Sequence, residues 1–205
     1  MITVAMTTRE ADCEDRSDKR DDPRAATVYL ALGANLGDRE ASLREGLERI
    51  AALGLRITRC SSIYETEPVG FADQGWFLNQ VVEAQLRHND KPDAEAALAE
   101  QAVLLLDALL RIESEMGRRR VTANGPRVID IDILLCDAIA GVFGHAPLPE
   151  LILPHPRMHL RRFVLAPLCE IAPDVVHPVL RKRCRELLAA LDDPAAVRLY
   201  ERSEP

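Results

Sequence analysis

Alternating apolar and polar residues predict most of the strands of this chain. A side chain on a strand points to the opposite face of the sheet from its neighbour, so a half-buried strand alternates in sequence. The stretches with this pattern are 27–32, 55–64, 77–86 and 127–135, and the last residues from Val197 add a candidate edge strand. We therefore expect a sheet of short strands.

The first helix is predicted after Asp38, a suitable N-cap residue, and Gly54 is a suitable stop. Between them, apolar residues recur at the three- and four-residue spacing of one helix face. These residues are Leu43, Leu47 and Ile50. Two shorter apolar stretches, 163–168 and 184–191, predict short helices nearer the C-terminus.

The stretch 92–116 predicts the longest helix. Its apolar residues form one stripe at helical spacing, Pro92 suits a first turn, and Gly117 suits a C-terminal stop. Core packing explains this stripe without a cofactor. Glu113 and Glu115 lie off the stripe, so periodicity alone predicts that both side chains face solvent.

The order of these elements is strand, helix, strand, strand, helix, strand. This is the order of the ferredoxin-like βαββαβ plan, an α+β fold in which an antiparallel sheet has helices packed on one face. We assign a single domain to residues 27–205. Residues 1–26 carry many charges and no periodicity, which predicts a disordered N-terminal extension. That extension is either a tail with its own role or the product of a start codon assigned too early.

Composition and charge narrow the class of protein. Of the 205 residues 47% are hydrophobic, no apolar run approaches the length of a membrane span, and the net charge is −7. An acidic chain does not favour a general nucleic-acid-binding surface, so we expect neither nucleic acid nor a membrane as partner. The 5 cysteines include no C-x-x-C pair and no secretory signal begins the chain, which is typical of a cytoplasmic protein. We expect it to act as a monomer.

The strand 127–135 carries the strongest chemical signal. Asp130 and Asp132 point to one face of it, with their Cα atoms about 6.6 Å apart. Two neighbouring carboxylates suit a pair of divalent cations, and aspartate is otherwise a poor strand former. A simple solvated strand face is the alternative. The arginines that precede the pair favour a polyphosphate site. They are Arg118, Arg119, Arg120 and Arg127.

Two loops and one turn add candidate positions. The connection 65–76 is long for a loop inside a domain and contains aromatic residues, which favours an ordered, functional loop. In the segment 154–163, His155 lies between prolines and close to several arginines, so it is either a structural histidine or part of an anion site. The turn 33–38 lacks the G-x-x-x-x-G-K-[ST] spacing of a P-loop, and we interpret it as a turn only.

Four segments resemble those of one known family. They are L-A-L-G-A-N-L-G-D at 30–38, Y-E-T-E-P-V-G-F-A-D-Q-G-W-F-L-N at 64–79, N-G-P-R-V-I-D-I-D-I-L-L at 124–135 and L-P-H-P-R-M-H-L-R-R-F-V-L-A-P-L at 153–168. Their order and spacing are similar to those of the 6-hydroxymethyl-7,8-dihydropterin pyrophosphokinases of folate biosynthesis, over residues 28–173. The resemblance implies the ferredoxin-like fold.

The resemblance also implies an activity and its residues. The pyrophosphoryl group of ATP would move to the hydroxymethyl oxygen of the pterin and release AMP, with two Mg²⁺ ions as cofactors and ATP and the pterin as small-molecule substrates. Asp130 and Asp132 match the metal ligands, and together with Arg118 and Arg127 they are the expected catalytic residues. The positions that match ATP contacts are Glu113, Arg120, Ile133, His155 and Arg161. Those that match pterin contacts are Thr66, Val69, Phe77, Asn79 and Phe163.

The chain departs from the family at two positions near the expected site. Asn124 stands where well-known members often have tryptophan, and Pro156 where some have tyrosine, so substrate affinity and loop closure are the properties in question. We assign no residue as a general base. Two other functions stay open: a non-catalytic binding module with affinity for ATP or pterin, and a D-x-D nucleotidyltransferase that would release pyrophosphate instead of AMP.

Overall fold

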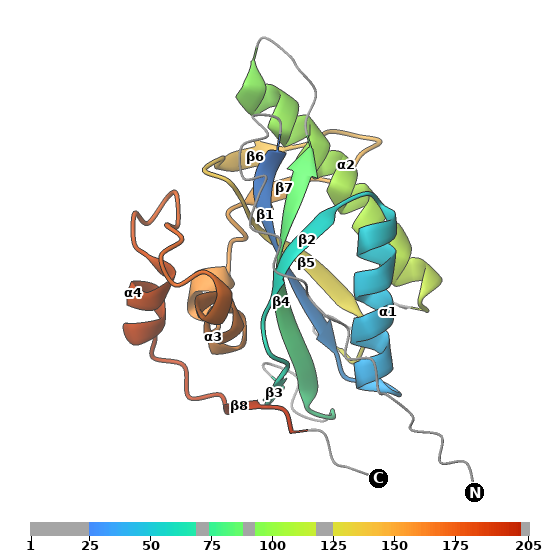
Figure 1. Cartoon of the computed structure of the whole chain (residues 1–205), viewed down its shortest axis with the longest axis vertical. Coiled ribbons are helices and arrows are strands. Elements are labelled where there is room, and N and C mark those ends of the chain that lie inside the picture. Colours follow the sequence, from blue (N-terminus) through green and yellow to red (C-terminus); the bar gives the residue numbers. More distant parts are fainter. Residues whose placement is uncertain (1–24, 69–73, 88–92, 118–124, 202–205) are drawn as a thin grey trace, which may run out of the picture.

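The computed structural model describes residues 25–68, 74–87, 93–117 and 125–201 (Figure 1). The strands are β1 (Ala25–Ala34), β2 (Arg56–Cys60), β3 (Tyr64–Thr66), β4 (Phe77–Arg87), β5 (Asp130–Cys136), β6 (Gly141–Phe143), β7 (Leu151–Leu153) and β8 (Val197–Leu199). The helices are α1 (Arg39–Ala52), α2 (Ala94–Glu115), α3 (Arg162–Ile171) and α4 (Cys184–Ala189), with a short 3-10 helix η1 (Met158–Leu160). Of the predicted extension 1–26, only the last two residues are described, and they begin β1. The rest of it lies outside the described residues.

The main sheet is antiparallel in all of its described pairings. Its strand order is β5, β1, β4, β3, β8, and β2 and β3 pair with successive parts of β4. A second, small sheet is formed by β6 and β7. The elements β1, α1, β2, β4, α2 and β5 follow the predicted βαββαβ order, so the α+β ferredoxin-like fold is confirmed.

The prediction of one continuous strand over 55–64 is wrong. The stretch divides into β2 and β3, which pair with different parts of β4. Between them, the Ser61 side chain accepts the N–H of Val81 at 3.0 Å, and the Ser61 carbonyl accepts from Gln80 Nε2 at 2.8 Å. Side-chain hydrogen bonds thus replace part of the strand ladder. Contacts of this kind leave no mark in the alternation of apolar residues.

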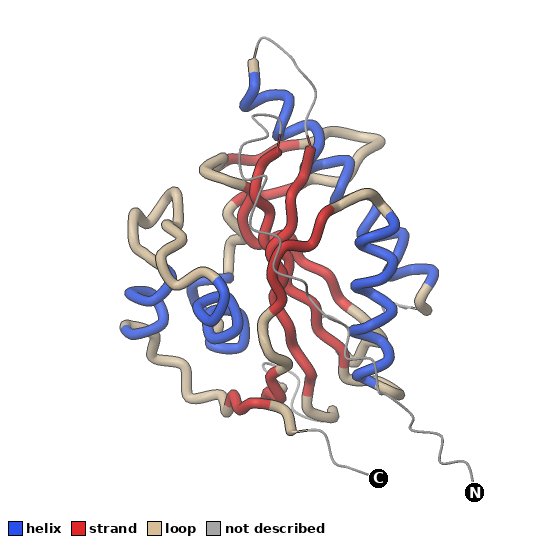
Figure 2. The backbone as a smooth tube through the Cα atoms, in the orientation of Figure 1, coloured by secondary structure: helices blue, strands red, loops and turns tan. Residues whose placement is uncertain are grey.

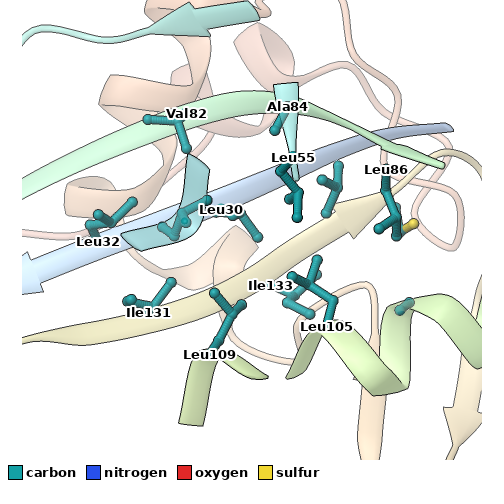
Figure 3. Close-up of a cluster of buried hydrophobic side chains, with 14 of the residues drawn as sticks. Leu30, Leu32, Leu55, Val82, Ala84, Leu86, Leu105, Leu109, Ile131 and Ile133 are labelled. Carbon is teal, nitrogen blue, oxygen red and sulfur yellow. The ribbon is translucent and has the colours of Figure 1, made fainter. Parts of the chain in front are cut away.

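Helices cover both faces of the sheet (Figures 1 and 2). α1 and α2 lie on one face, as the βαββαβ plan predicts, and α3 and α4 add a second helical layer on the other. The larger core lies under α1 and α2, where Leu30, Ile131 and Leu109 are neighbours (Figure 3). The smaller core lies under α3 and α4 and includes Val81 and Leu165. Burial of these apolar faces is the main force that holds the layers together.

Most element boundaries lie within a few residues of the predicted ones. β1 is longer than 27–32 at both ends, and β5 starts at Asp130 instead of Arg127. α2 begins after Asp93, whose side chain caps the first turn, while the predicted start at Pro92 lies outside the described residues. The strands β6 and β7 were not predicted. In the part of the chain that the structure describes, no helix has the length and hydropathy needed to cross a membrane.

Candidate active site

Four adjacent strands carry an in-register row of residues that starts at Asp130. Asp130 on β5 is opposite Gly33 on β1, which in turn is opposite Asn79 on β4. The row ends at Tyr64 on β3, whose hydroxyl donates to Glu170 of α3 at 2.9 Å. Directly opposed residues of antiparallel strands project to the same face of a sheet. Asp130 and Asn79 therefore share the face on which α3 lies, and only a glycine separates them.

Gly33 leaves the space that the Asn79 side chain occupies. A Cβ atom at Gly33 would lie 2.8 Å from Asn79 Oδ1, which is closer than two packed atoms of this kind approach. Asn79 Nδ2 donates to Thr66 Oγ1 at 2.6 Å, so the amide carbonyl is held over β1. Phe77 lies opposite Thr66 in the ladder between β3 and β4. Three residues predicted to contact the pterin are thus brought together.

Asp130 and Asp132 occupy alternate positions of β5 on this same face, and each has a basic side chain beside it. Arg127 Nη1 donates to Asp130 Oδ2, and His155 Nε2 lies 3.9 Å from Asp132 Oδ2. The side chains of Asp130 and Asp132 are 20% and 42% exposed, so a ligand can reach both. Ile131 between them is buried in the larger core, as the alternation predicted.

The aspartate pair fits a hard divalent cation. Magnesium prefers oxygen ligands and commonly uses one or two carboxylates together with the phosphates of a substrate. Across residues 25–68, 74–87, 93–117 and 125–201, no group of three or more His, Cys, Asp and Glu side chains could hold a metal ion. What the described chain offers is therefore a pair of neighbouring carboxylates that are 20% and 42% exposed.

An arginine lies over each of the two aromatic rings predicted to contact the pterin. The guanidinium carbon of Arg127 is 5.7 Å from the centroid of the Phe77 ring, and that of Arg161 is 5.4 Å from the centroid of the Phe163 ring. Both distances are within the range of cation–π attraction. Because Arg127 also donates to Asp130, it joins the aromatic part of the site to the acidic part.

His155 is a neutral group in an otherwise charged region. Burial, followed by the charges of Arg161 and Arg157, lowers the pKa of His155 to about 4. Its Nδ1 accepts the N–H of Arg157 at 3.2 Å, so the neutral ring carries its proton on Nε2, the atom that faces Asp132. The backbone N–H of His155 donates to the carbonyl of Leu134 at 2.8 Å, which fastens this loop to β5.

Arg161 belongs to the same cluster. Burial and the charge of Arg157 lower the pKa of Arg161, while Asp132 and Asp130 act on it in the opposite direction. The guanidinium therefore lies within electrostatic reach of both carboxylates. This arrangement favours the anion-site interpretation of segment 154–163 over a purely structural role for its histidine.

The prediction that Glu113 faces solvent is wrong. Glu113 is only 2% exposed, and its Oε1 accepts the backbone N–H of Ile131 at 2.7 Å. Periodicity compares a position with the apolar stripe of its own helix and does not show the polar strand edge beside it. Glu115, with a side chain 65% exposed, faces solvent as predicted. Ile133 lies in the core at 3% exposure, so its predicted contact with ATP would have to be made by its backbone atoms.

Asn35 is a site residue that the sequence interpretation missed, because the turn 33–38 was interpreted as a turn only. Its Nδ2 donates to Gln74 Oε1 at 3.0 Å and to the carbonyl of Gly75 at 3.3 Å. Its Oδ1 accepts the backbone N–H of Arg127 at 2.8 Å. One buried amide thus connects the loop before β4 with the segment before β5. The available signal was the position of Asn35 inside one of the four family-like segments.

Some predicted positions lie outside the described residues. They are Val69, Arg118, Arg120 and Asn124. Their assignments stay predictions. The described positions are brought together in two adjoining groups: an amide and aromatic group around Asn79, and an acidic and basic group around Asp130.

Paired carboxylates and arginines on one face of the sheet are the residue types with which phosphotransferases hold metal ions and phosphates. The chain belongs to the 7,8-dihydro-6-hydroxymethylpterin-pyrophosphokinase family, whose sequence model matches residues 29–173. It is similar to a Bacillus subtilis protein named 2-amino-4-hydroxy-6-hydroxymethyldihydropteridine pyrophosphokinase, with 38% identity over 85% of this chain and 90% of the relative. A protein of the same name from Methylorubrum extorquens is 39% identical over 85% of this chain and 98% of the relative.

Solved structures support the fold. A crystal structure described as HPPK-DHPS in complex with substrates superimposes with a TM-score of 0.59 at 16% sequence identity. The match covers 81% of this chain and 43% of that chain, so this chain spans less than half the length of that solved relative. A Plasmodium falciparum HPPK-DHPS variant bound to pterin and p-hydroxybenzoate gives the same TM-score of 0.59, with coverage of 83% and 44%. At this level of identity the likeness concerns the fold alone.

Proposed function

We propose that this chain transfers the pyrophosphoryl group of ATP to 6-hydroxymethyl-7,8-dihydropterin, giving AMP and the pterin diphosphate in tetrahydrofolate biosynthesis. Membership of the pyrophosphokinase family supports the reaction class. The observation that carries the proposal is the row from Asp130 through Gly33 to Asn79. In this row, a carboxylate suited to a metal-bound polyphosphate and an amide suited to a heterocycle are separated by one intervening strand, β1.

On the acceptor side, Asn79 supplies the polar recognition of the ring. Its amide has both donor and acceptor atoms, as the edge of a pterin requires. The bond from Asn79 Nδ2 to Thr66 fixes the orientation of the amide. Phe77 and Phe163 would stack on the ring, each adding on the order of 1 kcal/mol beyond the area that it buries. Substrate orientation then depends on side chains already held by β3, β4 and α3.

On the donor side, Asp130 and Asp132 would hold two Mg²⁺ ions together with the phosphates of ATP. When bound, these ions would neutralise the triphosphate and stabilise the charge that develops on the departing AMP. Arg127 and Arg161 would bind nonbridging phosphate oxygens through their guanidinium groups. His155, which is neutral, would donate its Nε2 proton in a hydrogen bond without adding charge.

The transfer forms one bond and breaks one bond. The hydroxymethyl oxygen of the pterin bonds to the β-phosphorus, the bond from that phosphorus to the oxygen bridging to the α-phosphorus breaks, and AMP keeps the bridging oxygen. The hydroxyl proton is released, and we assign no side chain as its acceptor, because positioning and charge stabilisation supply most of the rate enhancement in phosphoryl transfer.

The experiment that tests the proposal is nucleotide product analysis. Purified protein is incubated with Mg²⁺ and ATP, with and without 6-hydroxymethyl-7,8-dihydropterin, and a parallel reaction contains excess EDTA. AMP should form only when both pterin and metal are present. Formation of ADP or pyrophosphate would show a different transfer reaction. Absence of product, with calorimetric binding of ATP or pterin, would identify a binding module instead.

A further inference from the structure

Glu113 is a buried carboxylate whose described partner is the protein backbone. It lies in the last turn of α2, and its Oε1 accepts the N–H of Ile131 at 2.7 Å. Ile131 is the residue between Asp130 and Asp132. The carboxylate of one element therefore binds the main chain of another at the position from which both candidate metal ligands project.

The bond forms at the edge of β5 that faces away from β1. β5 is an edge strand of the main sheet, and β1 is the only described strand that pairs with it. Backbone groups of successive residues in an antiparallel strand point alternately toward and away from the neighbouring strand. The N–H of Ile131 that reaches Glu113 is therefore one that β1 does not bind. Without Glu113 this buried donor would lose its described acceptor, at a cost comparable to a lost hydrogen bond.

The position of this carboxylate is unfavourable for α2 itself. Burial takes a charged group out of water, and the last turn is the negative end of the helix dipole. That turn contains no basic residue to offset the charge. Glu115, in the same turn, faces solvent and forms an ion pair with Arg49 at 2.8 Å. The contact with β5 therefore gives Glu113 a role outside its own helix.

We propose that Glu113 is a positioning residue for the aspartate pair. By holding the N–H of Ile131, it fixes the edge of β5 between Asp130 and Asp132, and so sets the direction in which their carboxylates project. This role rests on the proposed function, in which those carboxylates hold magnesium. It differs from the ATP contact that the family resemblance implies, because the atom that Glu113 binds here belongs to the protein.

The same bond also links two elements that are distant in the sequence. It joins the end of α2 to β5 across a sequence separation of 18 residues. Of the described residues between them, Arg127 matches a phosphate-binding position of the family and donates to Asp130. Glu113 thus fixes the end of α2 relative to β5 and the two aspartates. A displacement of about 1 Å in such a framework can lower a rate a hundredfold.

Two substitutions separate the reach of the Glu113 side chain from its charge. Glu113→Asp keeps the charge but shortens the side chain by about 1.5 Å, which takes the carboxylate out of hydrogen-bond range of Ile131. Glu113→Gln keeps both the reach and a carbonyl acceptor but removes the charge. We expect E113D to lower kcat about 10- to 100-fold and to raise the Mg²⁺ concentration needed for half-maximal rate. We expect E113Q to stay within about threefold of the unsubstituted protein.

Amide hydrogen exchange at Ile131 gives a readout that does not depend on turnover. The Ile131 amide should be protected in the unsubstituted protein and in E113Q, and should exchange faster in E113D. Glu115→Asp and Glu115→Gln make the same chemical changes in the same turn, on a side chain that faces solvent. Both controls should leave the exchange rate and kcat unchanged, with the KM for pterin unchanged in all four variants.

Two outcomes would overturn the inference, and a third would separate it from the proposed function. An E113D variant that keeps its kcat and its Ile131 protection would remove the positioning role. An E113Q variant that raises the KM for ATP while Ile131 stays protected would show that Glu113 acts on the nucleotide through its charge. If the unsubstituted protein forms no AMP, the proposed function fails, and the exchange data on E113D and E113Q still decide whether Glu113 holds the edge of β5.

Discussion

The two faces of the main sheet are built from alternate residues of the same strands, yet they differ in chemistry. On β5, Ile131 is 2% exposed and faces the core under α1 and α2, whereas Asp130 and Asp132 on either side of it are partly exposed on the opposite face. On β1, the buried Leu32 is followed by Gly33, which has no side chain. One register therefore sets both the core and the site, because a shift of one residue would exchange the two faces.

The face that bears the aspartates is itself divided. Val81 and Leu135 are each 1% exposed and pack under α3 and α4, while Asn79 and Asp130 lie in a row of polar residues beside them. The apolar part contributes to stability in the same way as the opposite face. Substitutions in the polar row should therefore change activity with little loss of stability, and substitutions in the apolar parts should do the reverse.

The largest effect is expected at the aspartates. Asp130→Ala or Asp132→Ala should lower the rate of AMP formation at least about a thousandfold, because each removes a carboxylate expected to hold the metal against the triphosphate. The thermal midpoint should change little, because relief of like-charge repulsion between the aspartates opposes the loss of their contacts with basic side chains, such as the bond from Arg127 to Asp130. Rates come from the product assay, with saturating Mg²⁺ and pterin, and midpoints from calorimetry. Normal turnover in either variant would remove that aspartate from the metal site.

The residue between the aspartates should show the opposite behaviour. Ile131→Ala removes a buried side chain from the larger core and should lower the free energy of unfolding by about 2–4 kcal/mol. Below the unfolding transition, AMP formation per folded molecule should be largely kept. Urea titration measures the stability, and Ile152→Ala on the exposed face of β7 is the control, expected to cost less than about 0.5 kcal/mol. Equal losses in both variants would contradict the assignment of the core face.

A smaller and more selective effect is expected at Gly33. Gly33→Ala puts a Cβ atom 2.8 Å from Asn79 Oδ1, so the amide must move away from the position that the proposed pterin contact requires. The KM for the pterin should rise about 10- to 100-fold, while ATP binding measured by calorimetry stays the same. Gly46→Ala is the control, because its Cβ would have its nearest contact at 3.4 Å, with a flexible leucine side chain. An unchanged KM for the pterin in the Gly33 variant would show that Asn79 does not need this space.

The alternation of apolar and polar residues predicted the features that depend on a single strand and on which of its faces is buried. The strands β1, β4 and β5, the outward direction of Asp130 and Asp132, and the inward direction of Ile131 all follow from a period of two. The break between β2 and β3 did not follow, because it depends on hydrogen bonds that Ser61 accepts from β4. The second helical layer was also missed, since the short helices gave no sign of which face they would cover.

The site was predicted where the chemistry resides in neighbouring residues, and was missed where it depends on distant ones. The acidic pair and its preceding arginines could be found in the sequence. Glu113 and Asn35 could not be understood there, because their partners lie 18 and 92 residues away and are backbone N–H groups, which no residue type marks. The role of Gly33, which leaves space for the Asn79 side chain, is likewise visible only in the strand pairing that puts it opposite Asn79.

The smallest predicted effect is on the free energy of unfolding, at Glu65, whose ion pairs join three elements of the fold. Glu65 on β3 forms ion pairs with Arg198 of β8 at 2.7 Å and with Arg39 of α1 at 2.9 Å. Hydrogen bonds from Arg198, and then from Arg39, lower the pKa of Glu65, although burial acts in the opposite direction. A carboxyl with a lowered folded-state pKa stabilises the fold above its unfolded pKa of about 4.3, and that contribution is lost as the pH falls through the folded value.

Glu65→Gln should therefore lower the free energy of unfolding at pH 7 by less than about 1 kcal/mol, since Arg198 is 66% exposed and water screens the pair. The difference between the variant and the unsubstituted protein should shrink as the pH falls below about 4, because both then carry a neutral side chain at this position. Urea titrations at a series of pH values measure it, with Glu45→Gln as the control for an exposed pair. A difference that stays constant with pH would mean that Glu65 acts through packing, and AMP formation at pH 7 should be unaffected in either case.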